Sequence, residues 1–404
     1  MRFVLVPFLP PPRNPAADAL LGEVPLDLIS DALYDACELV ERFVSDWAIA
    51  IAQRLELEPD LAEGRTADAI LSARTYPDTQ RPALAWLLAR LAEAGDIEAV
   101  PETTPPVYRQ LRPFRTPELA ELRKHALELE PAILPTLTLL DAAGEAFPDV
   151  LTGRVTGEQA LFSGARMQLW LDYFNNANLV YAINNRIAAV AAANRLPPPS
   201  AAGLRILEVG AGAGSAADAL LEVLRERNRL GEIVEYRLTE PNPMLRRRAS
   251  RTLAAKYPGL AMTDSAYDFD QDPATQGLLA ESFDLVFSVN VLHIARSLRG
   301  SLTALRSLLK PGGWLIGGEC QRLFPHQTIA VELIFEQLQS FTQVELDAEV
   351  RTNHGFLTPE QWNQALAATG YVEVGHVPDL TRLRFEYARF FSGAVCARRP
   401  EAAP

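Results

Sequence analysis

The sequence contains few cysteines and few basic residues for its length. Three cysteines occur among 404 residues, at Cys37, Cys320 and Cys396. None forms a CxxC pair, so neither a disulfide framework nor a metal site is indicated. Lysine and arginine number 38 against 51 aspartates and glutamates, which gives a net charge of −13. General nucleic-acid or anionic-membrane binding requires a basic surface, so we expect no nucleic-acid partner.

The sequence also lacks a hydrophobic run long enough to cross a membrane. Its apolar N-terminus is interrupted by Pro7 and by the prolines at 10–12, and no small-residue cleavage site follows. We therefore expect no signal peptide, no membrane partner and a cytoplasmic location. Residues 1–16 are expected to be an extended arm stiffened by proline.

The length of the chain favours two domains, and its 48% apolar residues are ample for their cores. We expect a mainly helical N-terminal domain at 1–130, a helical lid and linker at 131–200, and a ligand-binding α/β domain at 201–400. An inserted segment is expected at 321–357. The Pro-Pro-Pro stretch at 197–199 has the composition of a stiff linker between domains.

Residues 81–115 have the pattern of a winged-helix module. A helical segment at 82–94 is followed by Gly95 and by two strand-like pieces around a proline-rich tip. Such a module can bind DNA, but the acidic composition argues against that ligand here. We therefore expect this module either to mediate dimerisation or to shape a substrate pocket, and we expect the protein to be a homodimer.

A short apolar run and a glycine-rich turn follow one another at residues 204–214. Leu204–Val209 has the composition of a buried parallel strand, and a helical pattern begins near Ser215. The combination of strand, glycine turn and helix binds nucleotide-like ligands. The carboxylate of Glu208 would repel a pyrophosphate but attract the ammonium of an amino acid.

The motif E-V-G-A-G-A-G resembles the first motif of the class I S-adenosylmethionine (SAM) methyltransferases. The resemblance implies SAM as the cofactor, held by Glu208, Gly210, Ala211, Gly212 and Gly214.

Alternating strand and helix patterns continue to the C-terminus. Further strands are expected at 233–238, 283–288, 314–318, 371–377 and 391–398, in addition to one before Asp268. LKPGG at 309–313 is predicted to be a turn, and Thr358 is predicted to cap a helix at 358–369. Seven strands with a closing pair at the C-terminus predict the class I methyltransferase fold, a Rossmann-like seven-stranded α/β sheet.

Several residues near the expected strand ends are candidates for holding the cofactor. Glu240 ends the second strand, where a carboxylate can accept hydrogen bonds from both ribose hydroxyls; alternatively it is a surface acid. Asp268 can accept from the adenine amino group, with Asp270 and Asp272 as nearby alternatives, and Phe269 can stack on the ring. The remaining expected contacts are Pro241, Met244, Asn290 and Val291.

Three segments carry a more specific resemblance: YDFDQDPATQG at 267–277, NVLH at 290–293 and LKPGGWLIGGE at 309–319. They resemble the C-methyltransferase domains of polyketide and mixed polyketide–peptide synthases, with similarity from about Leu161 to the C-terminus. The resemblance implies that His293 and Glu319 form a dyad that removes the proton from the carbon to be methylated. A histidine held by a carboxylate is suited to that role, although His293 could also merely pack against the cofactor.

Aromatic residues cluster just upstream of the glycine motif, at Trp170, Tyr173, Phe174 and Tyr181. Such a stripe is either core or the lining of a substrate pocket, where aromatic faces suit a sulfonium cation.

Three functions remain open from the sequence. The first is methyl transfer to a carbon or oxygen nucleophile of a small-molecule or carrier-bound intermediate in natural product biosynthesis. The second is cyclisation of SAM to azetidine-2-carboxylate and methylthioadenosine, as in the methyltransferase-like azetidine-2-carboxylate synthases. The third is a non-catalytic SAM-binding regulator.

Overall fold

The computed structural model describes residues 15–100, 103 and 105–402, which fold into two compact units. The first unit comprises the chain up to Leu20 together with Leu26–Arg166 and Thr328–Gln337. The second comprises Leu21–Pro25, Met167–Gln327 and the chain from Leu338 onward. Residues 1–14 of the arm expected at 1–16 lie outside the described residues. The last two, Pro15 and Ala16, belong to the first helix.

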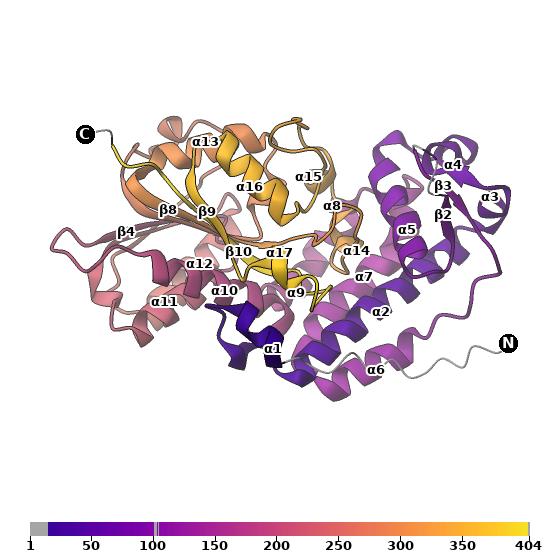
Figure 1. The fold of residues 1–404 in the computed structure, drawn as a ribbon, viewed down its shortest axis with the longest axis horizontal. Coiled ribbons are helices and arrows are strands. Elements are labelled where there is room, and N and C mark those ends of the chain that lie inside the picture. The colour runs from indigo at the N-terminus through magenta and orange to yellow at the C-terminus, as the bar shows by residue number, and fades with distance from the viewer. Residues whose placement is uncertain (1–14, 101–102, 104, 403–404) are drawn as a thin grey trace. The chain divides into compact units, whose positions relative to one another are not determined.

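The first unit is mainly helical (Figure 1). Its longest helix, α2, begins after Ser30, whose side chain accepts a hydrogen bond from the backbone N–H of Leu33. The apolar positions of α2 recur every three or four residues and form the buried face. The helices of this unit are α1 (Pro15–Asp18), α2 (Asp31–Arg54), α3 (Glu58–Glu63), α4 (Ala67–Arg74), α5 (Arg81–Glu93), α6 (Leu119–Leu129), α7 (Leu134–Leu151), α8 (Gly157–Leu161) and α14 (Glu332–Phe335).

A small antiparallel sheet accompanies helices α4 and α5. Its strands are β1 (Arg65–Thr66), β2 (Glu98–Val100) and β3 (Val107–Arg109), in the order β1-β3-β2. The helix and the strand pair expected at 81–115 are therefore present, as α5 and the β2–β3 pair. This arrangement resembles the winged helix that the sequence pattern predicts.

The second unit contains a seven-stranded sheet in the order β6-β5-β4-β7-β8-β10-β9, in which β10 runs antiparallel to its neighbours. The predicted fold class is thereby confirmed. The main chain of β4 lies between β5 and β7, so the order of strands reverses at this point, and ligands bind beyond the carboxyl ends of strands at such a position. The strands are β4 (Leu204–Val209), β5 (Ile233–Thr239), β6 (Met262–Ser265), β7 (Phe283–Val289), β8 (Leu309–Cys320), β9 (Val372–Val377) and β10 (Ser392–Arg398).

Helices cover both faces of this sheet (Figure 1). Helices α10, α11 and α12 lie on one face, and α13 and α16 lie on the other. The predicted cap of α16 is present, because Thr358 accepts from the backbone N–H of Gln361 in a capping box. The helices of the unit are α9 (Met167–Tyr173), α10 (Leu179–Arg195), α11 (Ser215–Glu226), α12 (Pro243–Lys256), α13 (Leu298–Leu308), α15 (Gln339–Thr342), α16 (Pro359–Ala368) and α17 (Leu380–Leu383).

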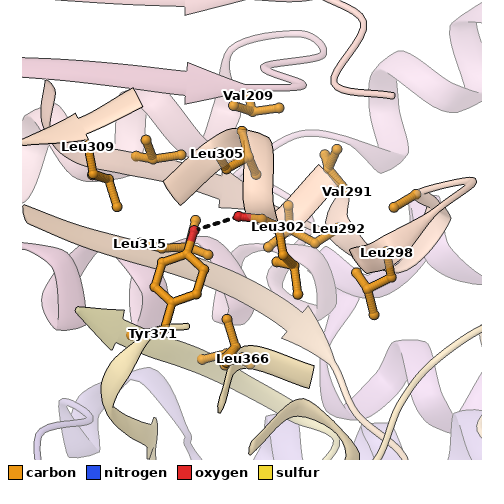
Figure 2. Packing of buried hydrophobic residues seen from close by; sticks show 14 of the residues in the cluster. Val209, Val291, Leu292, Leu298, Leu302, Leu305, Leu309, Leu315, Leu366 and Tyr371 are labelled. Atoms are coloured by element: carbon orange, nitrogen blue, oxygen red, sulfur yellow. Dashed lines mark hydrogen bonds between the residues drawn. The ribbon is translucent and has the colours of Figure 1, made fainter. Parts of the chain in front are cut away.

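The core between the sheet and α13 fixes the turn that follows β7. Leu298, Leu302 and Leu305 lie three or four residues apart on α13 and pack beside Val291 and Leu292 (Figure 2). The hydroxyl of Tyr371 donates a 3.1 Å hydrogen bond to the carbonyl of Leu302. Val291 and Leu292 are thus held by packing as well as by the backbone.

The prediction of a turn at LKPGG is wrong. Strand β8 begins at Leu309, which pairs with Phe283, and the pairing resumes between Trp314 and Leu285. The residues between form an irregularity within one strand, where Gly312 has φ +76°. Only the pairing with β7 reveals this arrangement, which the local composition of LKPGG does not.

The division into units also differs from the expected domains. Helices α9 and α10, expected in a separate lid at 131–200, belong to the second unit, because α10 packs against β7, β8, β9 and β10. Within the expected insertion at 321–357, Thr328–Gln337 belongs to the first unit. There Leu333 and Ile334 are fully buried, and Glu332 accepts from the indole N–H of Trp86.

Candidate active site

The glycine turn after β4 depends on close approach to the turn after β7. Gly210 has φ +69°, and a Cβ at this position would lie 2.5 Å from Cγ2 of Val291. Ala211 donates its N–H to the carbonyl of Thr239 at 2.9 Å, which fixes the turn against the end of β5. Gly214, with φ +91°, caps α11. A side chain at Gly210 is excluded both by space and by conformation.

Glu240 faces this turn from the end of β5 and is 7% exposed. Its carboxylate accepts from the backbone N–H of Gly212 at 2.9 Å and from that of Asn242 at 2.8 Å. Burial raises the pKa of Glu240. Pro241 follows directly, and Met244, 43% exposed, lies in the first turn of α12. The structure thus brings Glu240, Pro241 and Met244 to the same edge as the glycines.

Glu208 is buried within β4, with 1% of its surface exposed. Its Oε2 accepts a 3.0 Å hydrogen bond from the hydroxyl of Tyr236, whereas Oε1 makes no hydrogen bond of ordinary geometry. Burial raises the pKa of Glu208 to about 8. The backbone N–H of Ala217 also interacts with this carboxylate. A carboxylate with so few donors around it can accept a further hydrogen bond from a ligand, such as one from an ammonium group.

The raised pKa of Glu208 makes a testable difference to stability. Between pH about 4.5 and pH about 8 the folded protein keeps a proton that the unfolded chain has released. The free energy of unfolding contributed by this residue therefore falls as the pH rises through that window. In thermal melts, Glu208→Gln is expected to lose less stability than the unmodified protein from pH about 5 to pH about 8. If the melting temperatures of the two proteins changed with pH by the same amount, the raised pKa of Glu208 would be refuted.

Asp268 and Phe269 lie beyond β6, in a loop that is held by side chains. Asp268 is exposed; its Oδ1 accepts from the N–H of Asp270, and its own N–H donates to Gln276. Asp270 in turn accepts from the N–H of Arg296 and from Ser301, so it has a structural role. Phe269 is half-buried and packs on the core cluster of the unit. Contact of Asp268 and Phe269 with adenine stays a prediction.

The imidazole of His293 and the carboxylate of Glu319 are in direct contact. Nδ1 of His293 lies 2.6 Å from Oε2 of Glu319, and the two residues are 3% and 0% exposed. The other carboxylate oxygen accepts from the N–H of Leu292 at 2.8 Å and of Val291 at 3.3 Å. When Nδ1 donates to the carboxylate, Nε2 is the ring nitrogen that can accept a proton.

Asn290 shapes the backbone that leads to this dyad. It has φ +55°, a left-handed conformation that asparagine tolerates. Its Oδ1 accepts from Nδ2 of Asn184 at 2.9 Å and from the N–H of Cys320 at 3.2 Å. Asn290 therefore joins the ends of β7 and β8 to helix α10. Contact of Asn290 and Val291 with a cofactor is not tested.

The four predicted aromatic residues do form one cluster. The rings of Tyr173, Phe174 and Tyr181 have centroids 5.3–5.5 Å apart, and Trp170 stacks on Phe174 at 5.3 Å. Burial raises the pKa of Tyr181, and electrostatic interaction with Glu208 and Glu319 raises it further. The cluster therefore lies within electrostatic reach of the strand ends that carry the other candidate residues.

Sequence reasoning gave no role to several residues that surround the site. Two phenylalanine rings pack against the imidazole of His293, at 5.7 Å for Phe341 and 4.6 Å for Phe356. Tyr236 could have been suspected, because it lies on the neighbouring strand β5, two residues before the position that pairs with Glu208. The phenylalanines come from a segment without strand or helix periodicity, so no sequence pattern indicated them.

A family model for a methyltransferase domain matches residues 207–315. This segment is a methyltransferase domain. It contains the glycine turn, Glu240 and the NVLH segment that carries His293. The prediction of a methyltransferase domain is confirmed by this match.

The methyltransferase domain and its surroundings are similar to parts of polyketide synthases. The highly reducing polyketide synthase ALT1 of Alternaria alternata is 31% identical over 268 residues, which are 66% of this chain. The chain spans only 9% of the length of that protein. The predicted resemblance to polyketide synthase methyltransferase domains is thereby confirmed.

Two solved structures share the whole fold. The CurJ carbon methyltransferase superimposes with a TM-score of 0.76 at 23% identity, covering 96% of this chain and 97% of its own. The DszA carbon methyltransferase gives 0.71 at 24% identity, covering 98% and 99%.

Within the described part of the chain, no three acidic, histidine or cysteine side chains are grouped so that they could hold a metal. Over the same residues, every helix is too short or too polar to cross a bilayer.

Proposed function

We propose that this protein transfers the methyl group of SAM to a carbon nucleophile of a polyketide-type intermediate. The observation that carries the proposal is the buried contact of 2.6 Å between His293 and Glu319 at the carboxyl edge of the sheet. Acyl intermediates of polyketide assembly have an acidic carbon between two carbonyl groups, and methylation there requires a positioned base.

The residues around the glycine turn fit SAM. Gly212 has φ +53° and open space where a Cβ would lie, so a ligand can approach the backbone of the turn closely at this residue. Glu240 can accept from ribose hydroxyls, and the buried carboxylate of Glu208 can accept from the methionine ammonium. SAM supplies an activated methyl group when it is bound.

The dyad supplies the base. Nε2 of His293 takes the proton of the acceptor carbon, whose electron pair forms the new bond to the methyl group. The bond between the methyl carbon and the sulfur breaks, S-adenosylhomocysteine leaves as a neutral thioether, and the proton passes to water. Glu319 keeps the imidazole oriented and stabilises its protonated form.

The aromatic cluster is proposed to line the acceptor pocket, and the acceptor to be a small molecule or a carrier-bound acyl chain. We further propose a cytoplasmic homodimer assembled through the first unit, which the molecular mass in solution would test. Nucleic acid is not proposed as a ligand, since 51 acidic residues outnumber 38 basic ones.

The proposal is tested with a β-ketoacyl thioester, acetoacetyl-N-acetylcysteamine, as the acceptor probe. The purified protein is incubated with SAM and the probe, and mass spectrometry and NMR identify the products. We expect one added methyl group on the carbon between the carbonyls and one S-adenosylhomocysteine for each transfer. Methylthioadenosine formed from SAM alone would instead favour cyclisation to azetidine-2-carboxylate. A product methylated at oxygen would contradict the proposed carbon nucleophile.

A further inference from the structure

A buried arginine lies behind the dyad, in the second unit. Arg351 is 1% exposed. It lies between α15 and α16, in a segment without regular secondary structure. Burial of a guanidinium is costly unless its donors are satisfied. Desolvation lowers the pKa of Arg351 to about 10, although Glu319 and Asp270 favour its charged form.

The guanidinium satisfies its donors with backbone carbonyl groups from two segments. Towards the turn after β7, Nη2 donates to the carbonyl of His293 at 2.5 Å, and Nη1 donates to that of Ala295 at 2.8 Å. Towards its own segment, Nε donates to the carbonyl of Asn353 at 3.1 Å, and Nη2 also donates to that of Gly355 at 3.2 Å. One side chain therefore ties these two segments together.

Both segments contribute to the surroundings of the imidazole. The first contains His293 itself. The second leads into Phe356, whose ring centroid is 4.6 Å from that of His293, and Phe341 packs on both rings at 5.7 Å and 5.1 Å. Gly355 has φ +72°, and a Cβ there would lie 2.8 Å from the ring of Phe341. The loop is thus packed tightly in the conformation that Arg351 holds.

The fork geometry of the guanidinium explains why an arginine is suited to this position. Its five N–H groups point in fixed directions within one plane, so it can bridge two segments at once. A lysine keeps the charge but has a single nitrogen on a flexible stem. The substitution Arg351→Lys therefore keeps the positive charge but removes the bridge between the two segments.

We infer that Arg351 is a positioning residue for the dyad: it fixes the backbone of His293 against the segment that carries Phe356, and so orients the imidazole towards Glu319 and the acceptor. The inference rests on the proposed function for its catalytic consequence. Its geometric consequence, the orientation of the imidazole, can be measured without turnover.

The kinetic test compares Arg351→Met, Arg351→Lys and a control, Arg384→Lys. Arg384 also donates to a backbone carbonyl in this unit, that of Leu323. We expect both substitutions at position 351 to lower kcat with the thioester probe by about 10–100-fold, since small misplacements of catalytic groups cost that much. The KM for SAM should change by less than about twofold. The control should keep its kcat.

The spectroscopic test uses protein labelled with ¹⁵N-histidine. The Nδ1 proton of a histidine in a short hydrogen bond to a carboxylate gives a downfield NMR resonance, which is assigned by its loss in His293→Ala. We expect Arg351→Lys to shift or broaden this resonance and Arg384→Lys to leave it unchanged.

The possible outcomes separate the inference from the proposed function. If the unmodified protein does not methylate the probe, the proposed function fails, while the resonance still tests the positioning role. Unchanged resonance and kcat in Arg351→Lys would overturn bridging by the guanidinium, and a lowered melting temperature with normal kcat would leave only a structural role. If Arg351→Met does not fold, Arg351→Lys alone decides the question.

Discussion

Replacing His293 by alanine is expected to lower the rate of methyl transfer to the thioester probe by about 10²–10⁴-fold. The variant loses the nitrogen that takes the proton of the acceptor carbon. Because the proposed hydrogen bonds to SAM come from other residues, Glu208 and Glu240, binding of SAM should persist, with a dissociation constant within about a few-fold of the original. Rapid-quench measurement of S-adenosylhomocysteine formation gives the rate, and calorimetry gives the affinity for SAM.

Two further variants make this result specific. His326→Ala removes an exposed histidine of the same unit and should retain full activity. Glu319→Gln keeps the shape of the carboxylate partner but removes its charge, and should fall between His293→Ala and the unmodified protein. Turnover of the probe that survives His293→Ala would exclude this residue as the base.

Replacing Glu240 by alanine is expected to weaken binding of SAM at least about tenfold. Two hydrogen bonds to a charged acceptor contribute about 2–5 kcal/mol, and 1.4 kcal/mol corresponds to a tenfold change in affinity. The structure adds a second cause, because the carboxylate also holds the N–H groups of Gly212 and Asn242. Isothermal titration calorimetry measures the effect.

Glu235→Ala serves as the matched control for Glu240→Ala. This glutamate lies on the same strand and forms an ion pair with Arg205, away from the glycine turn. It should leave the affinity for SAM unchanged. Equal affinities for Glu240→Ala and the unmodified protein would remove Glu240 from the cofactor site.

The α/β fold could be predicted because its strands are short apolar runs bounded by turns. Leu204–Val209 was expected with the same bounds that the structure gives, since four of its six residues are apolar, as is typical of a strand buried in a parallel sheet. The pairing of His293 with Glu319 was implied by the resemblance to polyketide synthase C-methyltransferase domains. The sheet explains the contact, because His293 follows the end of β7 and Glu319 lies near the end of the parallel neighbour β8. Strand order thus converts distant sequence positions into adjacent side chains.

Other features depend on contacts that no local pattern encodes. Arg351 is a single arginine in an irregular segment, and its partners are carbonyl groups of the backbone, which every residue has. The break between α9 and α10 is another example. There the side chain of Asn178 donates to the carbonyl of Tyr173, while Asn176 donates to that of Ser215. The helical periodicity of the aromatic residues gave no sign of this break.

The excursion of Thr328–Gln337 has a consequence for how the chain can be divided. The polypeptide leaves the second unit soon after Glu319 and returns just before Phe341. The chain therefore reaches Phe341 and Phe356, the two rings beside the imidazole, only after it has passed through the first unit. A fragment starting at Met167 would retain α14 but lack the residues that bury Leu333 and Ile334. Exchange of the catalytic unit between related enzymes therefore requires three matched segments of chain, and a single junction does not suffice.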